Sequence, residues 1–143
     1  MNFSDCVKFA NRINTAYLAT EDGDQPRVRP LGMWYADDSG FYFQSQSVKA
    51  LCQQLQKNNK VEFSFFDPEA STVLRVSGVV EFINDIEVKR KCLEERTFLK
   101  DMGITTAEDP RLAIFKVYKG EAYFWTRRDS MKEADIPRIK FGK

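Results

Sequence analysis

The chain has 143 residues and a mass of 16.6 kDa, enough for one domain and too few for two independent cores. Its 22 Lys and Arg nearly balance 21 Asp and Glu, so the formal net charge of +1 does not point to nucleic acid or an anionic membrane as a partner. There is no histidine, which excludes an imidazole general base, a Ser-His-Asp triad and histidine-ligated zinc.

The cysteines and the N-terminal segment indicate the compartment. Cys6, Cys52 and Cys92 are odd in number and far apart, so we expect reduced, mostly buried thiols rather than disulfides or a metal site. Charged residues interrupt the apolar ones from Met1 to Asn14, unlike in a signal peptide, and no apolar run approaches the ~20 residues of a membrane span. We therefore expect a soluble cytoplasmic protein with no membrane partner.

The first half of the chain predicts two helices and three strands. Apolar spacing predicts a helix from its N-cap Ser4 to about Asn14. An antiparallel meander of three strands follows, over 15–20, 27–35 and 41–45. A second helix is predicted over 47–58 with Ser47 as its N-cap, because apolar side chains recur there at i, i+3, i+4 and i+7.

The second half predicts four more strands and one helix. Strands are expected over 60–66 and 72–82, with a bulge or bend at Gly78 in the second one. A helix capped by Asp85 is expected to extend to Leu99. Two closing strands, over 111–118 and 121–126, flank an expected turn at Lys119 and Gly120.

These elements predict an antiparallel α+β, mainly β, fold. Six or seven strands in hairpin connection, with two or three short helices, favour a small barrel over a doubly wound sheet. We expect a single domain over residues 1–143, whose charged tail, about 127–143, is extended on the surface.

Positively charged residues gather around one predicted helix start. Arg27 and Arg29 are two apart on a strand, so both leave the same face. Lys49 lies in the first turn of a helix, where the macrodipole disfavours a cation unless an anion is bound. With free backbone N–H groups and the hydroxyls of Ser45 and Ser47, these residues form a candidate phosphate site. The alternative is that they are ordinary surface charges.

Pro30 interrupts the same strand. Proline has no N–H, so the strand must be open on one side or lie at an edge, and Arg29 before it is biased to an extended conformation. Backbone groups exposed there can hydrogen-bond the edge of a planar heterocycle. The alternative is a plain edge strand.

The order of these motifs resembles the pyridoxamine 5'-phosphate oxidase-like, FMN-binding split-barrel family. An Arg-bearing strand (RVRPLG) leads to a Gly-aromatic strand (GFYF), a Ser-x-Lys helix start (SVK), an Asn-x-x-Val strand (NNKV) and an Arg-Val-x-Gly strand (RVSG). The resemblance is good over Thr15–Phe82 and looser elsewhere. It implies a homodimer of split β-barrels with FMN bound in two clefts at the subunit interface.

The resemblance also assigns cofactor contacts to the first strand of this region. Arg27 matches the arginine that contacts the FMN phosphate in the family. Val28, Arg29 and Pro30 match the strand that follows the flavin ring.

Further cofactor contacts are implied later in the chain. Gln44 and Ser45 match residues that face the ring edge or the ribityl phosphate, and Ser47 and Lys49 match the phosphate-binding helix start. Trp125 resembles an aromatic residue that approaches the flavin from the partner subunit. The alternative for Trp125 is a place in the core.

Two departures from the family pattern argue against pyridoxamine phosphate oxidation. The true oxidases carry a second basic residue before the lysine, where this chain has Val48, and their Arg- and His-bearing substrate segment has no counterpart. The nitroimidazole reductase-like branch is closer in length, but its members often place a histidine near the flavin, and this chain has none.

The resemblance thus implies an FMN-dependent oxidoreductase that acts on a small organic substrate or another flavin, with NADH or NADPH as donor. Its chemistry would lie in the flavin, because no catalytic acid or base stands out in the sequence. The same observation favours the alternative of a non-catalytic FMN-binding electron-transfer or redox-sensing module. A third alternative keeps the barrel and replaces FMN with a deazaflavin or haem, although the usual axial histidine for haem is missing.

Overall fold

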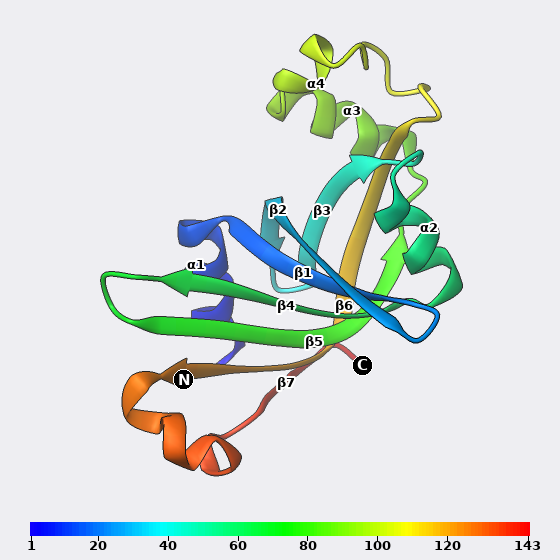
Figure 1. The fold of residues 1–143 in the computed structure, drawn as a ribbon. Coiled ribbons are helices and arrows are strands. Elements are labelled where there is room, and N and C mark those ends of the chain that lie inside the picture. Colours follow the sequence, from blue (N-terminus) through cyan, green and yellow to red (C-terminus); the bar gives the residue numbers. More distant parts are fainter.

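The computed structural model describes residues 1–143, which form one antiparallel sheet with helices around it (Figure 1). The elements in chain order are α1 (Phe3–Ile13), β1 (Thr15–Asp22), β2 (Gln25–Asp37), β3 (Gly40–Gln46), α2 (Ala50–Lys57), β4 (Lys60–Asp67), β5 (Thr72–Phe82), α3 (Ile86–Glu95), α4 (Phe98–Asp101), β6 (Leu112–Thr126), the 3-10 helix η1 (Arg127–Asp135) and β7 (Ile139–Phe141).

Six strands close into a barrel. Their order is β3-β2-β1-β4-β5-β6, and pairing of β3 with β6 completes the circle, while β7 adds to β6. α1 packs against the barrel, with Cys6 and Ala10 entering its core. The expected mainly β architecture with a small antiparallel barrel is therefore confirmed.

The barrel is split between β2 and β3. These strands pair only where Met33–Asp37 faces Gly40–Phe43, so the first half of β2 pairs with β1 alone. β3 continues beyond Phe43 with β6 as its only neighbour. Pro30 lies on the half of β2 that is open on one side, as its missing N–H predicts.

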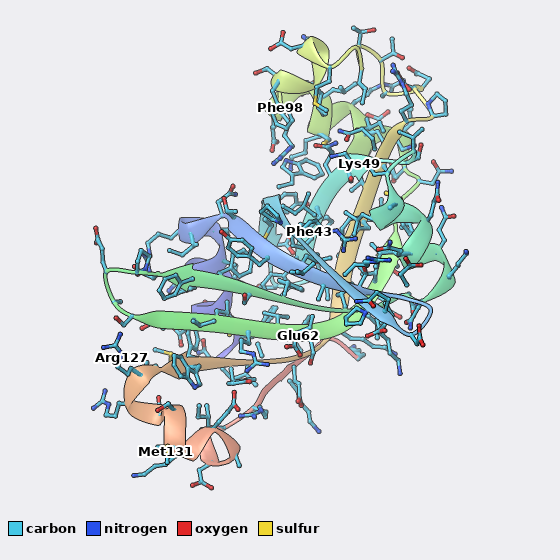
Figure 2. The ribbon with its side chains drawn as sticks, viewed as in Figure 1. Phe43, Lys49, Glu62, Phe98, Arg127 and Met131 are labelled. Carbon is cyan, nitrogen blue, oxygen red and sulfur yellow. The ribbon has the colours of Figure 1, made fainter.

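Phenylalanines fill the barrel. The rings of Phe41, Phe43, Phe63, Phe65 and Phe115 are all buried, and Phe43 lies inside the ring of strands (Figure 2). Phe43 packs edge-on against Phe63 at a centroid distance of 5.4 Å and stacks on Phe115 at 5.3 Å. Each such ring stabilises the fold by about 2–3 kcal/mol through burial alone. With Phe141, six of the twelve phenylalanines of the chain are buried in its core.

A second, smaller core lies under α3 and α4, which project from the barrel (Figure 1). Asp85 caps α3 as predicted, since its side chain accepts from the backbone N–H groups of Glu87 and Val88. The predicted continuation to Leu99 is wrong, because α3 ends at Glu95. Arg96 leaves helical geometry there, and its guanidinium donates to the carbonyl oxygen of Met33 at 3.2 Å.

The N-terminal helix is capped earlier in the chain than predicted. Asn2, not Ser4, is the N-cap of α1. The Asn2 side chain accepts from the Asp5 N–H at 3.1 Å, and the Asp5 carboxylate accepts from the Asn2 N–H at 2.8 Å. This reciprocal capping box satisfies two backbone donors at once. None of the helices has both the length and the apolar character needed to span a membrane.

The two closing strands predicted on either side of residues 119–120 are one continuous strand, β6. Gly120 does not turn the chain but pairs with Gly78 of β5, and a Cβ at Gly120 would lie 1.9 Å from the carbonyl oxygen of Ser77. The glycine pair thus allows a close approach of the two backbones. The irregularity predicted at Gly78 is confirmed, since the register of β5 and β6 shifts just beyond it.

The tail differs from the extended segment that was expected. η1 folds back, and β7 pairs with β6, burying Phe141 in the main core. Glu133 of η1 accepts from Arg75 at 2.7 Å and from the Tyr123 hydroxyl at 2.9 Å. These contacts hold the tail against the outer face of β5 and β6.

Gly120→Ala is expected to lower the free energy of unfolding by about 2 kcal/mol or more, because the added Cβ overlaps the Ser77 carbonyl. Gly23→Ala is the matched control: it also has a positive φ, of 66°, but its Cβ would meet no atom within 4 Å. Gly23→Ala should lower the free energy of unfolding by only ~1 kcal/mol, the cost of placing an alanine in the left-handed conformation. Urea unfolding measures both, and equal losses would contradict the close approach of the two backbones.

Burial raises the pKa values of Cys6 and Cys92 to about 11. These folded-state pKa values lie above those of the unfolded chain, so the neutral thiols favour folding at neutral pH, and this contribution is lost as the pH rises towards 11. We expect the free energy of unfolding to fall between about pH 9 and pH 11, by up to ~1.4 kcal/mol per pKa unit for each thiol. Cys92→Ala should make this decline shallower in urea titrations at a series of pH values.

The same burial should protect the native thiols from iodoacetamide at about pH 7.5, whereas Cys6, Cys52 and Cys92 should all react in urea. Rapid alkylation of the folded protein would contradict the burial of these groups.

Candidate functional site

The candidate site lies where β2 and β3 diverge, next to α2. The side chains of Arg27 and Arg29 share one face of β2, because they lie opposite Thr20 and Leu18, which both point inward from β1. The sequence predicted this shared face from the spacing of the two arginines. Their surroundings are nevertheless very different.

Arg29 is half-buried and held by neutral acceptors. Its Nη1 donates to the Thr20 hydroxyl at 2.8 Å and to the Leu18 carbonyl oxygen at 3.4 Å, and its Nη2 donates to Gln54 Oε1 at 2.7 Å. The Thr20 hydroxyl in turn donates to Gln54 Oε1 at 2.6 Å. The pKa of Arg29 is lowered, chiefly by burial and secondly by the positive charge of Arg27.

Arg27 is exposed and loosely held. Its Nε donates to Asp22 Oδ2 at 3.3 Å, and about half of each side chain is accessible to solvent. An exposed ion pair of this kind contributes little to stability, so Arg27 can leave Asp22 for another anion at small cost.

The end of β3 contains buried polar groups. Gln44 and Ser45 are both buried, and Gln44 Nε2 donates to the Ser45 carbonyl oxygen at 3.1 Å. The Ser45 hydroxyl has no hydrogen-bond partner, although the Cys52 thiol lies beside it without forming a hydrogen bond of normal geometry. A buried unpaired hydroxyl costs about 1–3 kcal/mol, which makes Ser45 a candidate ligand group.

The start of α2 differs from the prediction. The helix begins at Ala50, Lys49 is its N-cap, and no side chain caps it, so the predicted N-cap at Ser47 is wrong. The Ser47 hydroxyl instead donates to the carbonyl oxygen of Pro110 at 2.8 Å. Val48 is the first of the apolar side chains that recur at helical spacing over 47–58, but it is 69% exposed because it precedes the helix.

The uncapped start of α2 leaves donors free. No protein group accepts from the backbone N–H of Ala50 or Leu51, and Lys49, marked in Figure 2, forms no ion pair. Free N–H groups at a helix start, with a lysine and arginines nearby, are suited to an anion.

Val28 and Pro30 lie on the other face of β2. Their side chains alternate with those of Arg27 and Arg29 and point outward, and that of Val28 is largely exposed. The edge of β2 that faces away from β1 pairs with no strand here. The backbone of this segment is therefore open to a ligand, as the sequence predicts.

Trp125 is not brought to the other candidate residues within one chain. It pairs with Val73 of β5 and lies two residues before η1. The end of β6 that leads into η1 lies away from α2 (Figure 1). Its side chain is half-buried. The predicted contact with a partner subunit's flavin stays a prediction.

Thr20 and Gln54 join the site without having been singled out from the sequence. A signal for Gln54 was present, because it follows Leu51 by one helical turn and lies between Cys52 and Leu55 on the buried face of α2. A glutamine at such a position needs a polar partner. Arg29 and Thr20 provide it.

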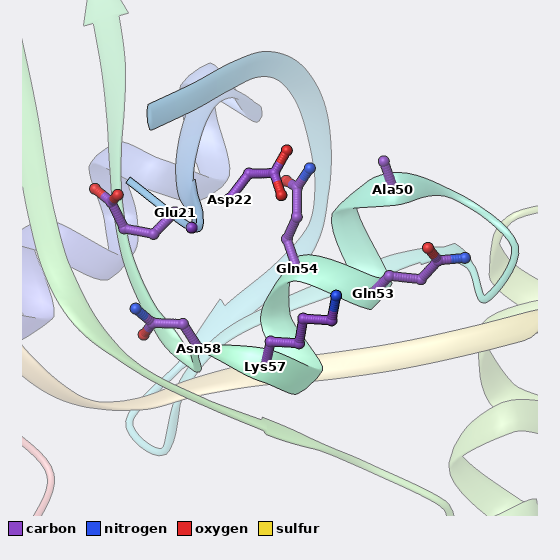
Figure 3. Close-up of a pocket in the computed structure, with 8 residues that line it drawn as sticks. Glu21, Asp22, Ala50, Gln53, Gln54, Lys57 and Asn58 are labelled. Atoms are coloured by element: carbon purple, nitrogen blue, oxygen red, sulfur yellow. The ribbon is translucent and has the colours of Figure 1, made fainter. Parts of the chain in front are cut away.

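A polar cavity of about 410 Å³ opens beside this network, between the β1–β2 turn and α2 (Figure 3). Its walls include Asp22, Gln54 and Lys57. The ion pair of Arg27 with Asp22 and the Arg29 network thus border one accessible space.

The chain matches the pyridoxamine 5'-phosphate oxidase family over residues 4–134. It belongs to this family. A pyridoxine/pyridoxamine 5'-phosphate oxidase from Pseudomonas putida (strain W619) is 37% identical over an alignment of 89 residues, which covers 59% of this chain and 41% of that protein. The matched segment therefore spans less than half the length of this curated relative.

Solved structures extend the comparison to nearly the whole chain. A NimC/NimA family protein from Clostridium acetobutylicum has a TM-score of 0.80 and 28% identity, covering 96% of this chain and 92% of that one. The general stress FMN/FAD binding protein from Xanthomonas citri has a TM-score of 0.69 and 17% identity, covering 85% and 86%. The second likeness shows the fold alone, and both agree with a split barrel.

Ser45→Ala is expected to leave the free energy of unfolding of the protein without added ligand unchanged or to raise it by about 1 kcal/mol, because it removes an unpaired buried hydroxyl. Ser47→Ala is the matched control, since it loses the hydrogen bond to Pro110 and should lower stability by about 1 kcal/mol. Urea unfolding compares them. A larger loss for Ser45→Ala than for Ser47→Ala would contradict the unpaired state of Ser45.

Proposed function

We propose that the protein is an FMN-binding oxidoreductase that holds the cofactor at the split between β2 and β3. The observation that carries this proposal is the group of donors without acceptors at that split. The Ser45 hydroxyl and the N–H groups of Ala50 and Leu51 are unpaired, and neither Lys49 nor Arg29 has a carboxylate partner. Such a set of donors fits the phosphate of a flavin mononucleotide.

The residues at the split have distinct proposed roles. Arg27 and Lys49 supply mobile positive charge for the phosphate, and the helix start supplies N–H donors. The open backbone edge of Val28–Pro30 and the amide of Gln44 face the ring system. When bound, FMN supplies the hydride or electron transfer.

The proposed chemistry is redox transfer to or from a small organic substrate, with NADH or NADPH as donor. The Pseudomonas relative is an oxidase and the Xanthomonas neighbour binds FMN or FAD, which supports redox chemistry on a flavin. Val48 stands where the true oxidases have a second basic residue, and we therefore do not propose pyridoxamine phosphate as the substrate. The buried, unpaired cysteines favour a reducing compartment such as the cytoplasm.

We also propose a homodimer with cofactor clefts at its interface. Tyr17, Val28 and Phe66 are apolar side chains on the outer face of β1, β2 and β4, and about half or more of each is exposed. Burial of this face against a second copy would remove the exposed apolar surface from water. Trp125 would then reach the partner's cofactor, which one chain alone does not allow.

A second candidate function is a non-catalytic electron-transfer module. The lack of any histidine, and of any other catalytic acid or base that stands out in the sequence, favours it. Stopped-flow mixing with NADH or NADPH distinguishes the two: rapid bleaching of the flavin supports the enzyme, and bleaching only by dithionite or a partner protein supports the module.

The purified protein is expected to be yellow, with two flavin absorption bands, and Arg27→Ala combined with Lys49→Ala should weaken FMN binding about 100-fold or more. Each cation contributes about 1.5–3 kcal/mol when it hydrogen-bonds a charged phosphate. Flavin fluorescence titration measures the loss. Lys8→Ala with Lys132→Ala is the control, because it removes the same charge from exposed sites on α1 and η1.

Uptake of a deazaflavin in place of FMN would support the proposed binding site and change only the identity of the cofactor. A colourless protein that takes up neither cofactor would overturn the proposed function.

A further inference from the structure

The two arginines of β2 have different partners. Arg27 pairs with the carboxylate of Asp22, whereas Arg29 donates only to oxygens without charge, on Thr20, Leu18 and Gln54. Several other arginines of the chain are neutralised by carboxylates: Arg12 by Asp67, Arg75 by Glu62 and Glu133, and Arg111 by Asp109. Arg96 of the second core, in contrast, donates only to the carbonyl oxygen of Met33. Arg29 keeps an uncompensated charge although it is half-buried.

The hydrogen bonds around Gln54 have one consistent direction. A guanidinium nitrogen of Arg29 and the Thr20 hydroxyl both lie within 2.7 Å of the same side-chain atom of Gln54. The guanidinium is always a donor, so that atom must be the amide oxygen. The Thr20 hydroxyl then donates to Gln54 and accepts from Arg29 at 2.8 Å. The three side chains form a closed ring of hydrogen bonds.

This ring connects α2 to the barrel. Gln54 lies one turn after Ala50, the first residue of α2, and both line the cavity beside the Arg27–Asp22 pair (Figure 3). The network therefore fixes the guanidinium of Arg29 relative to the helix start that carries the free N–H donors.

We propose that Gln54 is a positioning residue that fixes the guanidinium of Arg29 while leaving its positive charge available to the anionic cofactor. The proposal rests on the proposed function, because it assigns Arg29 a charge-based role at the same site. A glutamate at position 54 would accept the same two hydrogen bonds, but it would neutralise the arginine. The neutral amide of Gln54 orients the guanidinium of Arg29 and leaves its positive charge unpaired.

There is a physical reason why glutamine at position 54 would favour binding of an anion more than glutamate would. Burial strengthens the interaction between a fixed charge and a nearby anion, because less water screens it. A guanidinium that is already oriented also loses less entropy when the ligand arrives. A carboxylate next to Arg29 would keep the guanidinium oriented, but it would cancel the positive charge that attracts the anion.

Gln54→Glu tests the proposal, with Gln56→Glu as the matched control. Gln56 lies on the exposed face of the same helix, so this control adds the same negative charge away from Arg29. We expect Gln54→Glu to be at least as stable as the wild type in urea and to bind FMN about tenfold more weakly or worse. Gln56→Glu should change the affinity by less than about threefold.

A purely structural Gln54 predicts the opposite, since the glutamate retains the hydrogen bonds. Wild-type affinity in a stably folded Gln54→Glu variant would therefore overturn the proposal while the proposed function stands. Failure of the wild type itself to bind FMN or a deazaflavin would overturn the proposed function instead.

Gln54→Leu provides the second variant. It removes the acceptor that Arg29 and Thr20 share, and it should lower both the stability and the affinity for FMN. Unchanged stability together with unchanged affinity would show that the network neither holds Arg29 nor assists binding, and would also overturn the proposal.

Discussion

The divergence of β2 from β3 determines where the barrel wall is open to a ligand. Pairing between them stops at Met33 and Phe43, and Pro30 cannot donate a ladder hydrogen bond beyond that point. An open sheet edge is exposed to water or to another chain unless something covers it. Here α2 lies beside the opening, connected to β2 through Gln54 and Arg29, and the buried Ser45 hydroxyl at the end of β3 has no partner.

Features set by local periodicity could be predicted from the sequence. Alternation along Val61, Phe63 and Phe65 indicated β4, and Asp85 caps α3 as expected. Two of the errors came from contacts between distant residues. Ser47 hydrogen-bonds the carbonyl oxygen of Pro110 and does not cap α2, and Gly120 pairs with Gly78, so the expected turn lies within a continuous strand. Neither partner can be identified by spacing along the chain.

In the candidate site, too, the features that depend on local spacing could be predicted and those that depend on contacts between distant residues could not. The shared face of Arg27 and Arg29 follows from strand alternation, but their different partners do not. Asp22 and Gln54 come from a turn and a helix, so only the fold shows which arginine is mobile and which is fixed. A chain without histidine can still support redox chemistry at such a site, because the cofactor carries the reactive atoms and the protein supplies charge and position.

The unpaired donors at the split are proposed to recognise a phosphate, and two ligands that differ only in that group can test this. Isothermal titration of the flavin-free protein with FMN and with riboflavin compares them directly, because both carry the same ring system. We predict that riboflavin binds about 100-fold more weakly than FMN or worse, a difference of about 2.7 kcal/mol. Equal affinities for the two ligands would contradict phosphate recognition at this site.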